Sequence, residues 1–223
     1  MSGIGVLVIL LFVSSVPAIA VLMWFRYARY PFSVLRFSVS LLAGAVSVFP
    51  ALMLQSLFVA RDGNIFVIAF IEEFSRLLIL VMLLFAFYRL RSSGQPKTQT
   101  TISAETMAGS AGLIAGLGFA ILESAVYGAS NPVNALQRTF TTALLHGACG
   151  YRVGSSMAIF REHPVQAVFR FLTAVVIHSI YNYMLRIPGF IPSAAAILIA
   201  LSALVTSVIA IRSGMNSASS NER

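Results

Sequence analysis

Charged residues are scarce in this sequence, and their scarcity excludes most soluble folds. They make up 10% of the 223 residues, whereas hydrophobic residues make up 58%. A soluble domain of this size carries roughly 25% charged residues, and no polar stretch here is long enough to form a separate soluble domain. The mean hydropathy of +0.89 therefore indicates an integral membrane protein whose surroundings are the lipid bilayer.

Cysteine and aspartate are almost missing, which excludes two kinds of chemistry. Cys149 has no second cysteine with which to form an intrachain disulfide. Asp62 is the sole aspartate and lies in an expected loop, so a protease mechanism built on two aspartates is impossible. The sequence also lacks the HExxH motif of zincins, and the segment 109–112, GSAG, does not place its serine as a rhomboid-type GxSG motif does.

Acidic residues are outnumbered, 7 Asp+Glu against 15 Lys+Arg, which gives a net charge of +8. In a membrane protein, basic residues gather in cytoplasmic loops and near anionic lipid, so this charge does not indicate nucleic-acid binding. Most of the basic residues, among them Arg26, Arg91 and Arg161, fall at the expected helix ends on one side of the membrane. The positive-inside rule then predicts an outside N-terminus and a cytoplasmic C-terminus.

Apolar runs bounded by charged or turn residues predict seven transmembrane helices. Helices are expected throughout, because an open strand in lipid would leave its backbone groups unpaired. The expected spans are 3–25, 35–60, 64–88, 104–129, 138–160, 165–186 and 190–211. The fold class is all-α, a polytopic bundle in one membrane-embedded domain over residues 1–212. A Ser/Asn-rich tail, 213–223, is expected to be disordered and cytoplasmic.

Several ionisable residues fall inside the expected spans, although each costs at least ~2.5–3.5 kcal/mol at mid-depth in a bilayer. They are Glu72, Glu73, Glu123, His146 and His178. At a rise of ~1.5 Å per residue, all of them lie roughly 9–14 Å below the outer boundary of the membrane. Helices that run in alternating directions thus bring their polar groups into one layer, which indicates a functional site.

Helical spacing within this layer suggests its chemistry. Arg76 lies three and four residues after the adjacent Glu73 and Glu72, so one carboxylate can pair with the arginine. Adjacent carboxylates at low dielectric resist ionising together, so the other is suited to act as a general base. His178 and Asn182, at i and i+4, offer N–H donors to an oxyanion. Structural ion pairs and interhelical hydrogen bonds remain the alternative interpretation.

These glutamates and histidines leave two hydrolytic mechanisms open. In the first, which needs no cofactor, a glutamate activates water, a histidine orients it, and His178 with Asn182 stabilises the oxyanion. In the second, the same groups bind a divalent metal such as zinc, which makes the bound water more acidic. The expected metal ligands are Glu72, Glu123, His146 and His178.

Short blocks on successive expected helices, EEFSR, FAILESAVY, HGACG and HSIYN, resemble the PrsW membrane proteases. That family shows EExxK, an F/E…Y segment, HxxxG and HxxxN, and it is related to the type II CAAX prenyl endopeptidases and the bacterial Abi (CPBP) proteins. The blocks span a catalytic core of about 64–186. Arg76 stands where PrsW proteins usually have lysine, and Glu123 falls where the CAAX enzymes use histidine. The resemblance implies catalytic roles for Glu72, Glu73, Arg76, Glu123, His146, His178 and Asn182.

The resemblance further implies an endopeptidase that cuts a membrane-anchored protein, such as an anti-sigma factor, near the outer leaflet of a bacterial plasma membrane. Two other functions stay open. A proton- or metal-coupled transporter would use the polar layer as its ion site, although the sequence has no internal repeat of the kind that transporters show. A non-catalytic immunity or assembly protein would have kept only the scaffold.

Overall fold

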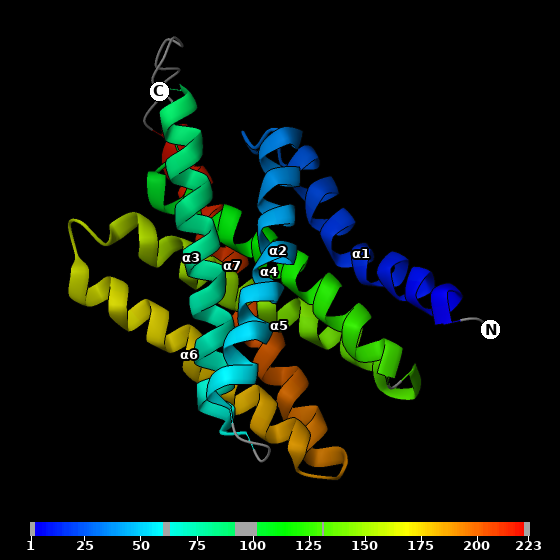
Figure 1. Ribbon diagram of the computed structural model, residues 1–223. Coiled ribbons are helices and arrows are strands. Elements are labelled where there is room, and N and C mark those ends of the chain that lie inside the picture. The colour runs from blue at the N-terminus through cyan, green and yellow to red at the C-terminus, as the bar shows by residue number, and fades with distance from the viewer. Residues whose placement is uncertain (1–2, 60–62, 92–101, 131, 221–223) are drawn as a thin grey trace.

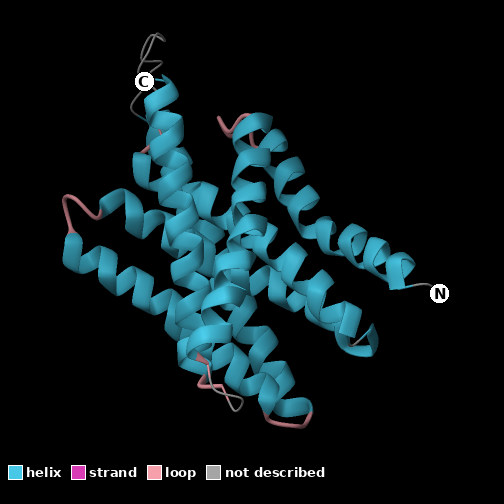
Figure 2. Ribbon diagram, viewed as in Figure 1, coloured by secondary structure: helices cyan, strands magenta, loops and turns pink. Residues whose placement is uncertain are grey.

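The computed structural model describes residues 3–59, 63–91, 102–130 and 132–220, so Asp62 lies outside the described residues. Within these ranges the chain forms seven α-helices and no strand (Figures 1 and 2). This confirms the all-α prediction. The helices are α1 (Gly3–Tyr27), α2 (Val34–Phe58), α3 (Ile65–Arg91), α4 (Ala104–Ser130), α5 (Pro132–Ile159), α6 (Pro164–Arg186) and α7 (Phe190–Ser220).

Five of the described helices are long and apolar enough to cross a membrane: α1, α2, α4, α6 and α7. The protein is therefore a multi-pass membrane protein. Helix α3 carries Glu72, Glu73 and Arg76 close together, and α5 is the most polar helix of the bundle. Charged and polar residues make α3 and α5 less apolar than the other helices, so crossing by these two stays a prediction, as does the orientation of the termini.

Two helix boundaries differ from those expected. Helix α5 begins at Pro132 rather than at 138, which is physically reasonable because the first helical position needs no N–H and suits proline. Helix α7 continues to Ser220, so the predicted tail boundary at Ser213 is corrected for residues 213–220. Tertiary packing explains the continuation, because a Cβ at Gly214 would collide with the side chain of Thr106 at the start of α4.

Helix α4 forms the centre of the bundle and packs against α5 and α2 through glycines. A Cβ at Gly112 would collide with the carbonyl oxygen of Gly150, and one at Gly116 would collide with that of His146. On the other side, a Cβ at Gly44 of α2 would collide with the Ala115 carbonyl of α4. These contacts bring the backbones of α2, α4 and α5 together, so side chains near the seams meet at short range.

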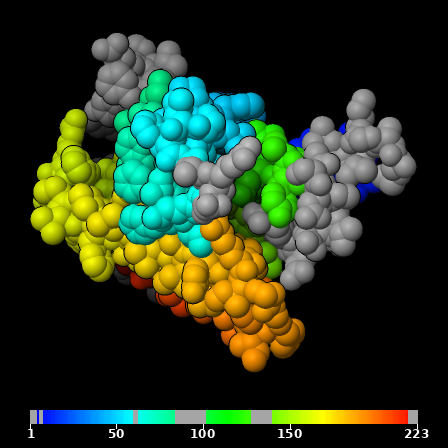
Figure 3. All heavy atoms as spheres, turned by 60° about the horizontal axis from the view of Figure 1, so that its bottom comes forward, coloured from blue at the N-terminus to red at the C-terminus, as the bar shows by residue number. Residues whose placement is uncertain are grey.

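Consecutive helices alternate in direction, so α1, α3, α5 and α7 begin at one end of the bundle (Figure 1). We call the end where α3 begins the proximal end. Seen from there, the start of α3 lies beside the turn between α6 and α7 (Figure 3). The Arg186 guanidinium at the end of α6 donates a hydrogen bond to the Gly63 carbonyl at 3.2 Å and ties the two segments together.

Candidate active site

Helix α3 supplies the charged centre of the site. Glu72 and Glu73 are adjacent and buried, and Arg76 is buried one turn further along the helix. The Arg76 guanidinium pairs with the Glu73 carboxylate, and its central carbon lies 4.6 Å from the centre of the Phe119 ring. The expected pairing of one carboxylate with Arg76 therefore falls on Glu73, in surroundings from which water is excluded.

His178, on α6, contacts both carboxylates with its two ring nitrogens. Its Nδ1 lies 2.8 Å from Glu73 Oε1, and its Nε2 lies 3.4 Å from Glu72 Oε2. Because a carboxylate accepts hydrogen bonds, Nδ1 carries a proton and donates a hydrogen bond to Glu73. In the neutral ring, this leaves the Nε2 lone pair directed at the space beside Glu72.

His146, on α5, extends the network to α4. Its Nδ1 lies 2.8 Å from Arg76 Nη2, and its Nε2 lies 3.0 Å from Glu123 Oε2. An arginine can only donate, so His146 Nδ1 accepts and Nε2 donates to Glu123. The two imidazole rings meet edge to face, with 4.8 Å between His146 and His178. Arg76 therefore links Glu73 on its own helix to the histidine of another.

Gln55, on α2, is a member of the cluster that the sequence analysis missed. Its side-chain amide donates a hydrogen bond of 2.9 Å to Glu72 Oε1. No motif marks the second span, but a weaker signal is present. Gln55 is a polar residue four positions after Ala51, which itself follows Ser47 and Val48 on the buried face of α2. A glutamine that continues an apolar buried stripe inside a membrane helix indicates a polar partner on a neighbouring helix.

Every predicted site residue except Asn182 joins this one cluster, contributed by helices α3 to α6 with Gln55 from α2. Asn182 lies one turn from His178 toward the proximal end and is half-buried, and the described residues include no hydrogen-bond partner for its side chain. Glu123 is the most accessible acidic member, with 24% of its side chain exposed. The cluster therefore has a buried centre and a partly open side at α4.

Glu72, His146 and His178 offer the oxygen and nitrogen ligand atoms that a divalent metal such as zinc binds. One ligand atom each from Glu72, His146 and His178 lies within 4.8 Å of the other two. Ligands of one zinc ion lie at most ~4.2 Å apart, twice a bond of ~2.1 Å, so a small contraction brings them into range. Within the described ranges Glu72 Oε2 is buried without a hydrogen-bond partner, and Glu73 orients His178 as carboxylates orient zinc-binding histidines. These residues therefore fit a divalent metal. To bind it, His146 would replace one of its two hydrogen bonds, to Arg76 or to Glu123, with a bond to the metal.

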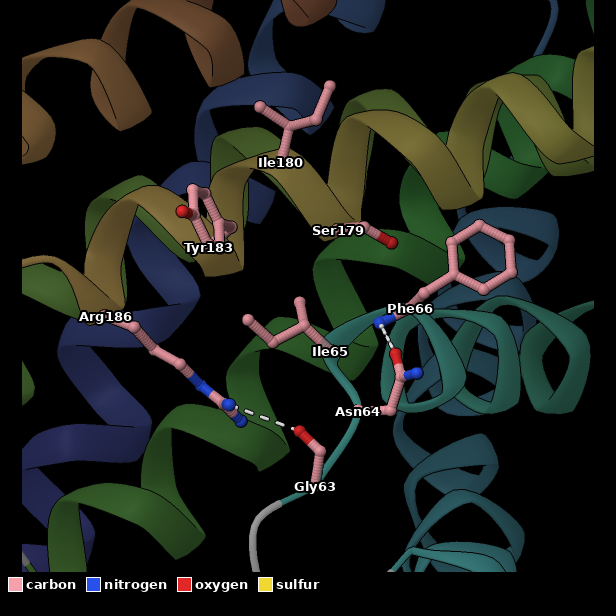
Figure 4. A pocket seen from close by; sticks show the side chains of 8 residues that line it. All are labelled: Gly63, Asn64, Ile65, Phe66, Ser179, Ile180, Tyr183 and Arg186. Atoms are coloured by element: carbon pink, nitrogen blue, oxygen red, sulfur yellow. Dashed lines mark hydrogen bonds between the residues drawn. The ribbon is translucent and has the colours of Figure 1, made fainter.

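A groove opens between the start of α3 and the end of α6, with a volume of about 480 Å³ (Figure 4). It is lined by Gly63, Asn64, Ile65, Phe66, Ser179, Ile180, Tyr183 and Arg186. Ile65 and Phe66 lie two helical turns, about 10 Å, before Glu72 and Glu73 on the same faces of α3. The groove therefore lies on the proximal side of the carboxylates.

Glutamates and histidines clustered inside a helical membrane bundle define a membrane protein with a buried functional site. The family model of the PrsW family intramembrane metalloproteases matches residues 31–211. The chain therefore belongs to this family and is a membrane protease. No curated protein and no solved structure matches the chain. Of the three functions left open by the sequence, the family supports proteolysis, while a relationship to the CAAX endopeptidases stays a prediction.

Proposed function

We propose that the protein is an intramembrane endopeptidase in which Glu72 activates the water that attacks a peptide bond of a membrane-anchored substrate. The observation that carries this proposal is the unequal use of the adjacent carboxylates. Glu73 accepts from both Arg76 and His178. Glu72 Oε2, by contrast, is buried, has no hydrogen-bond partner among the described residues and lies 3.4 Å from His178 Nε2. Glu72 is thus the carboxylate with an oxygen available for a proton.

Each neighbour of Glu72 then has a defined role. A water beside Glu72 Oε2 donates one proton to that oxygen as its own oxygen attacks the carbonyl carbon. His178 Nε2 accepts from the same water and orients it, because Nδ1 is already committed to Glu73. The oxyanion donor is then the side-chain amide of Asn182, one turn away. Glu72 finally returns the proton to the leaving amine nitrogen.

Charge balance supports a divalent cation among these groups. When the histidines are neutral, the buried carboxylates of Glu72 and Glu73 face the guanidinium of Arg76, which pairs with Glu73. Buried charges need compensation, and a divalent ion beside Glu72 supplies it. Glu72, His146 and His178 would hold it, with Glu123 beside them, and His178 Nε2 would then bind the ion in place of the hydrogen bond from water. A bound divalent metal supplies a Lewis acid and a more acidic water.

The substrate we propose is a membrane-anchored protein of the anti-sigma-factor kind, cut near the outer leaflet of a bacterial plasma membrane. The distribution of basic residues supports an outward proximal end, and the cluster lies about 10 Å from the start of α3. The groove between α3 and α6 supports this choice of partner, because it offers an open, apolar surface beside the cluster for residues that flank the cut bond.

Substitution of the cluster tests the proposal. The full-length protein is reconstituted in proteoliposomes with a tagged single-span substrate, and product is followed on gels. Glu72→Gln and His178→Ala are expected to abolish cleavage while the proteins stay folded. Glu105→Gln is the matched control, because Glu105 is a carboxylate of α4 that pairs with Arg170 outside the cluster. Full activity of both cluster variants would contradict the proposed mechanism.

Metal removal tests the second part of the proposal. Incubation with a strong chelator is expected to stop cleavage, and added zinc is expected to restore it, because the buried carboxylate of Glu72 needs a compensating positive charge. Restoration should fail in His178→Ala. A protein that cleaves at full rate in chelator, yet loses activity as Glu72→Gln, would refute the metal and leave Glu72 as an unassisted general base.

A further inference from the structure

Gln55 has a place in the bundle that a merely lipid-facing glutamine would not have. Its side chain is half-buried, and it follows Ala51, which is 1% exposed, by one helical turn on α2. Ser56, the next residue, is exposed and its hydroxyl bonds to the Met53 carbonyl of its own helix. Only Gln55 of this pair reaches across to α3. An amide in an apolar helix is costly unless it finds such a partner.

The hydrogen bond from Gln55 gives the two carboxylate oxygens of Glu72 different roles. The Gln55 amide donates to Oε1 at 2.9 Å, while Oε2 faces His178 Nε2 and has no hydrogen-bond partner in the part of the chain that the structure describes. A glutamate carboxylate turns readily about its last bond, since that torsion is broad and roughly two-fold. A donor fixed on another helix restricts this rotation and keeps the same oxygen directed at the histidine.

We propose that Gln55 is a positioning residue, which holds the Glu72 carboxylate so that Oε2 faces His178 and the reacting water. This inference rests on the proposed function and adds to it a contribution from α2, a helix outside the motif-bearing core. Gln55 acts through Glu72, so its loss leaves substrate binding intact and slows the chemical step. Catalytic geometry is sensitive to small displacements of this kind.

Kinetics of cleavage provide the first test, with the reconstituted full-length protein and a tagged single-span substrate. Gln55→Met keeps the length of the side chain and removes the donor, so kcat should fall roughly tenfold while KM stays within about twofold. Gln55→Glu keeps the shape but places an oxygen against Glu72, so its loss should be larger. Ser56→Ala is the matched control and should cleave at the parent rate.

Thermal unfolding provides a second readout that does not depend on cleavage. Gln55→Met should lower the unfolding midpoint by roughly 2–4 °C, because Glu72 Oε1 is left without its donor. In a Glu72→Met background, the same change removes an amide that has no partner, so the midpoint should stay the same or rise. This non-additivity is the signature of a direct contact.

The outcomes separate this inference from the proposed function. Equal midpoint losses in both backgrounds would show that the two side chains do not interact, and a parent-like kcat for Gln55→Met would show that the contact does not serve catalysis. Either result overturns the positioning role while loss of activity in Glu72→Gln still supports the proposed function. Full activity in Glu72→Gln would overturn the proposed function itself.

Discussion

Two arginine–glutamate pairs among the described residues allow a prediction on the energetics of burial. Arg76 and Glu73 form one pair, and neither side chain is exposed. Arg170 and Glu105 form the other, with 27% and 39% of the side chains exposed. Removing one partner of a buried pair typically costs about 3–5 kcal/mol, because the other charge is left uncompensated. An exposed pair contributes only about 0–1 kcal/mol.

Arg76→Met should therefore destabilise the protein by about 3–5 kcal/mol, and it also removes the donor to His146 Nδ1. Arg170→Met is the same substitution at the exposed pair, and we expect a cost of at most about 1 kcal/mol. The double variant Arg76→Met/Glu73→Met should recover much of the loss, since no charge remains unpaired. Unfolding by denaturant in detergent micelles, followed by circular dichroism, measures all of these variants.

The prediction is tested by comparing the loss of stability in Arg76→Met with that in Arg170→Met. Equal losses for Arg76→Met and Arg170→Met would mean that the centre of the site is as well solvated as the surface pair. A double variant that is less stable than Arg76→Met would mean that Glu73 stabilises the protein without the arginine. Either outcome refutes the interpretation of a buried, mutually compensated cluster, whatever the cleavage activity of the variants.

Two further predictions concern packing and substrate binding. Gly116→Ala should destabilise the protein by about 1–3 kcal/mol and reduce cleavage, because its Cβ would collide with the His146 carbonyl. Gly147→Ala should be tolerated, because its Cβ would meet the side chains of Leu117 and Leu113 at 3.4 Å or more. Thermal unfolding and cleavage assays compare the two variants. Ser179→Trp should fill the groove and raise KM several-fold with little change in kcat. Val176→Trp changes an exposed residue outside the groove and should leave KM unchanged. Equal KM values for the two variants would contradict a substrate-binding groove.

The sequence was sufficient to predict the helices and the gathering of polar residues from several of them, whereas their depth in the membrane stays a prediction. Glu72, His146 and His178 lie on different helices, and the limits of the apolar runs alone bring them to one layer. Contacts such as that between His146 and His178 follow from this placement, because polar groups at one depth in a bilayer have only each other as partners. The course of α7 past Ser213 was not predictable, because it depends on contact between Gly214 and α4.

Partners within the cluster were harder to predict than its members. Helical spacing puts Arg76 within reach of both Glu72 and Glu73, so the choice between them depends on what the other helices bring. His178 approaches Glu73 with its proton-bearing nitrogen, and Gln55 approaches Glu72. These two contacts from α6 and α2 decide which carboxylate is saturated, and they depend on side-chain directions that a single sequence does not specify.

The consequence of having arginine at position 76, where the family pattern has lysine, follows from the contacts of its side chain in the structure. At the level of the sequence, an arginine in place of lysine keeps the charge, which is all that an ion pair with Glu73 requires. In the structure, one guanidinium nitrogen pairs with Glu73 and another lies 2.8 Å from His146 Nδ1. A lysine presents a single ammonium group and does not reproduce this planar fork. The arginine therefore fixes the tautomer of His146, and with it the direction of the hydrogen bond to Glu123.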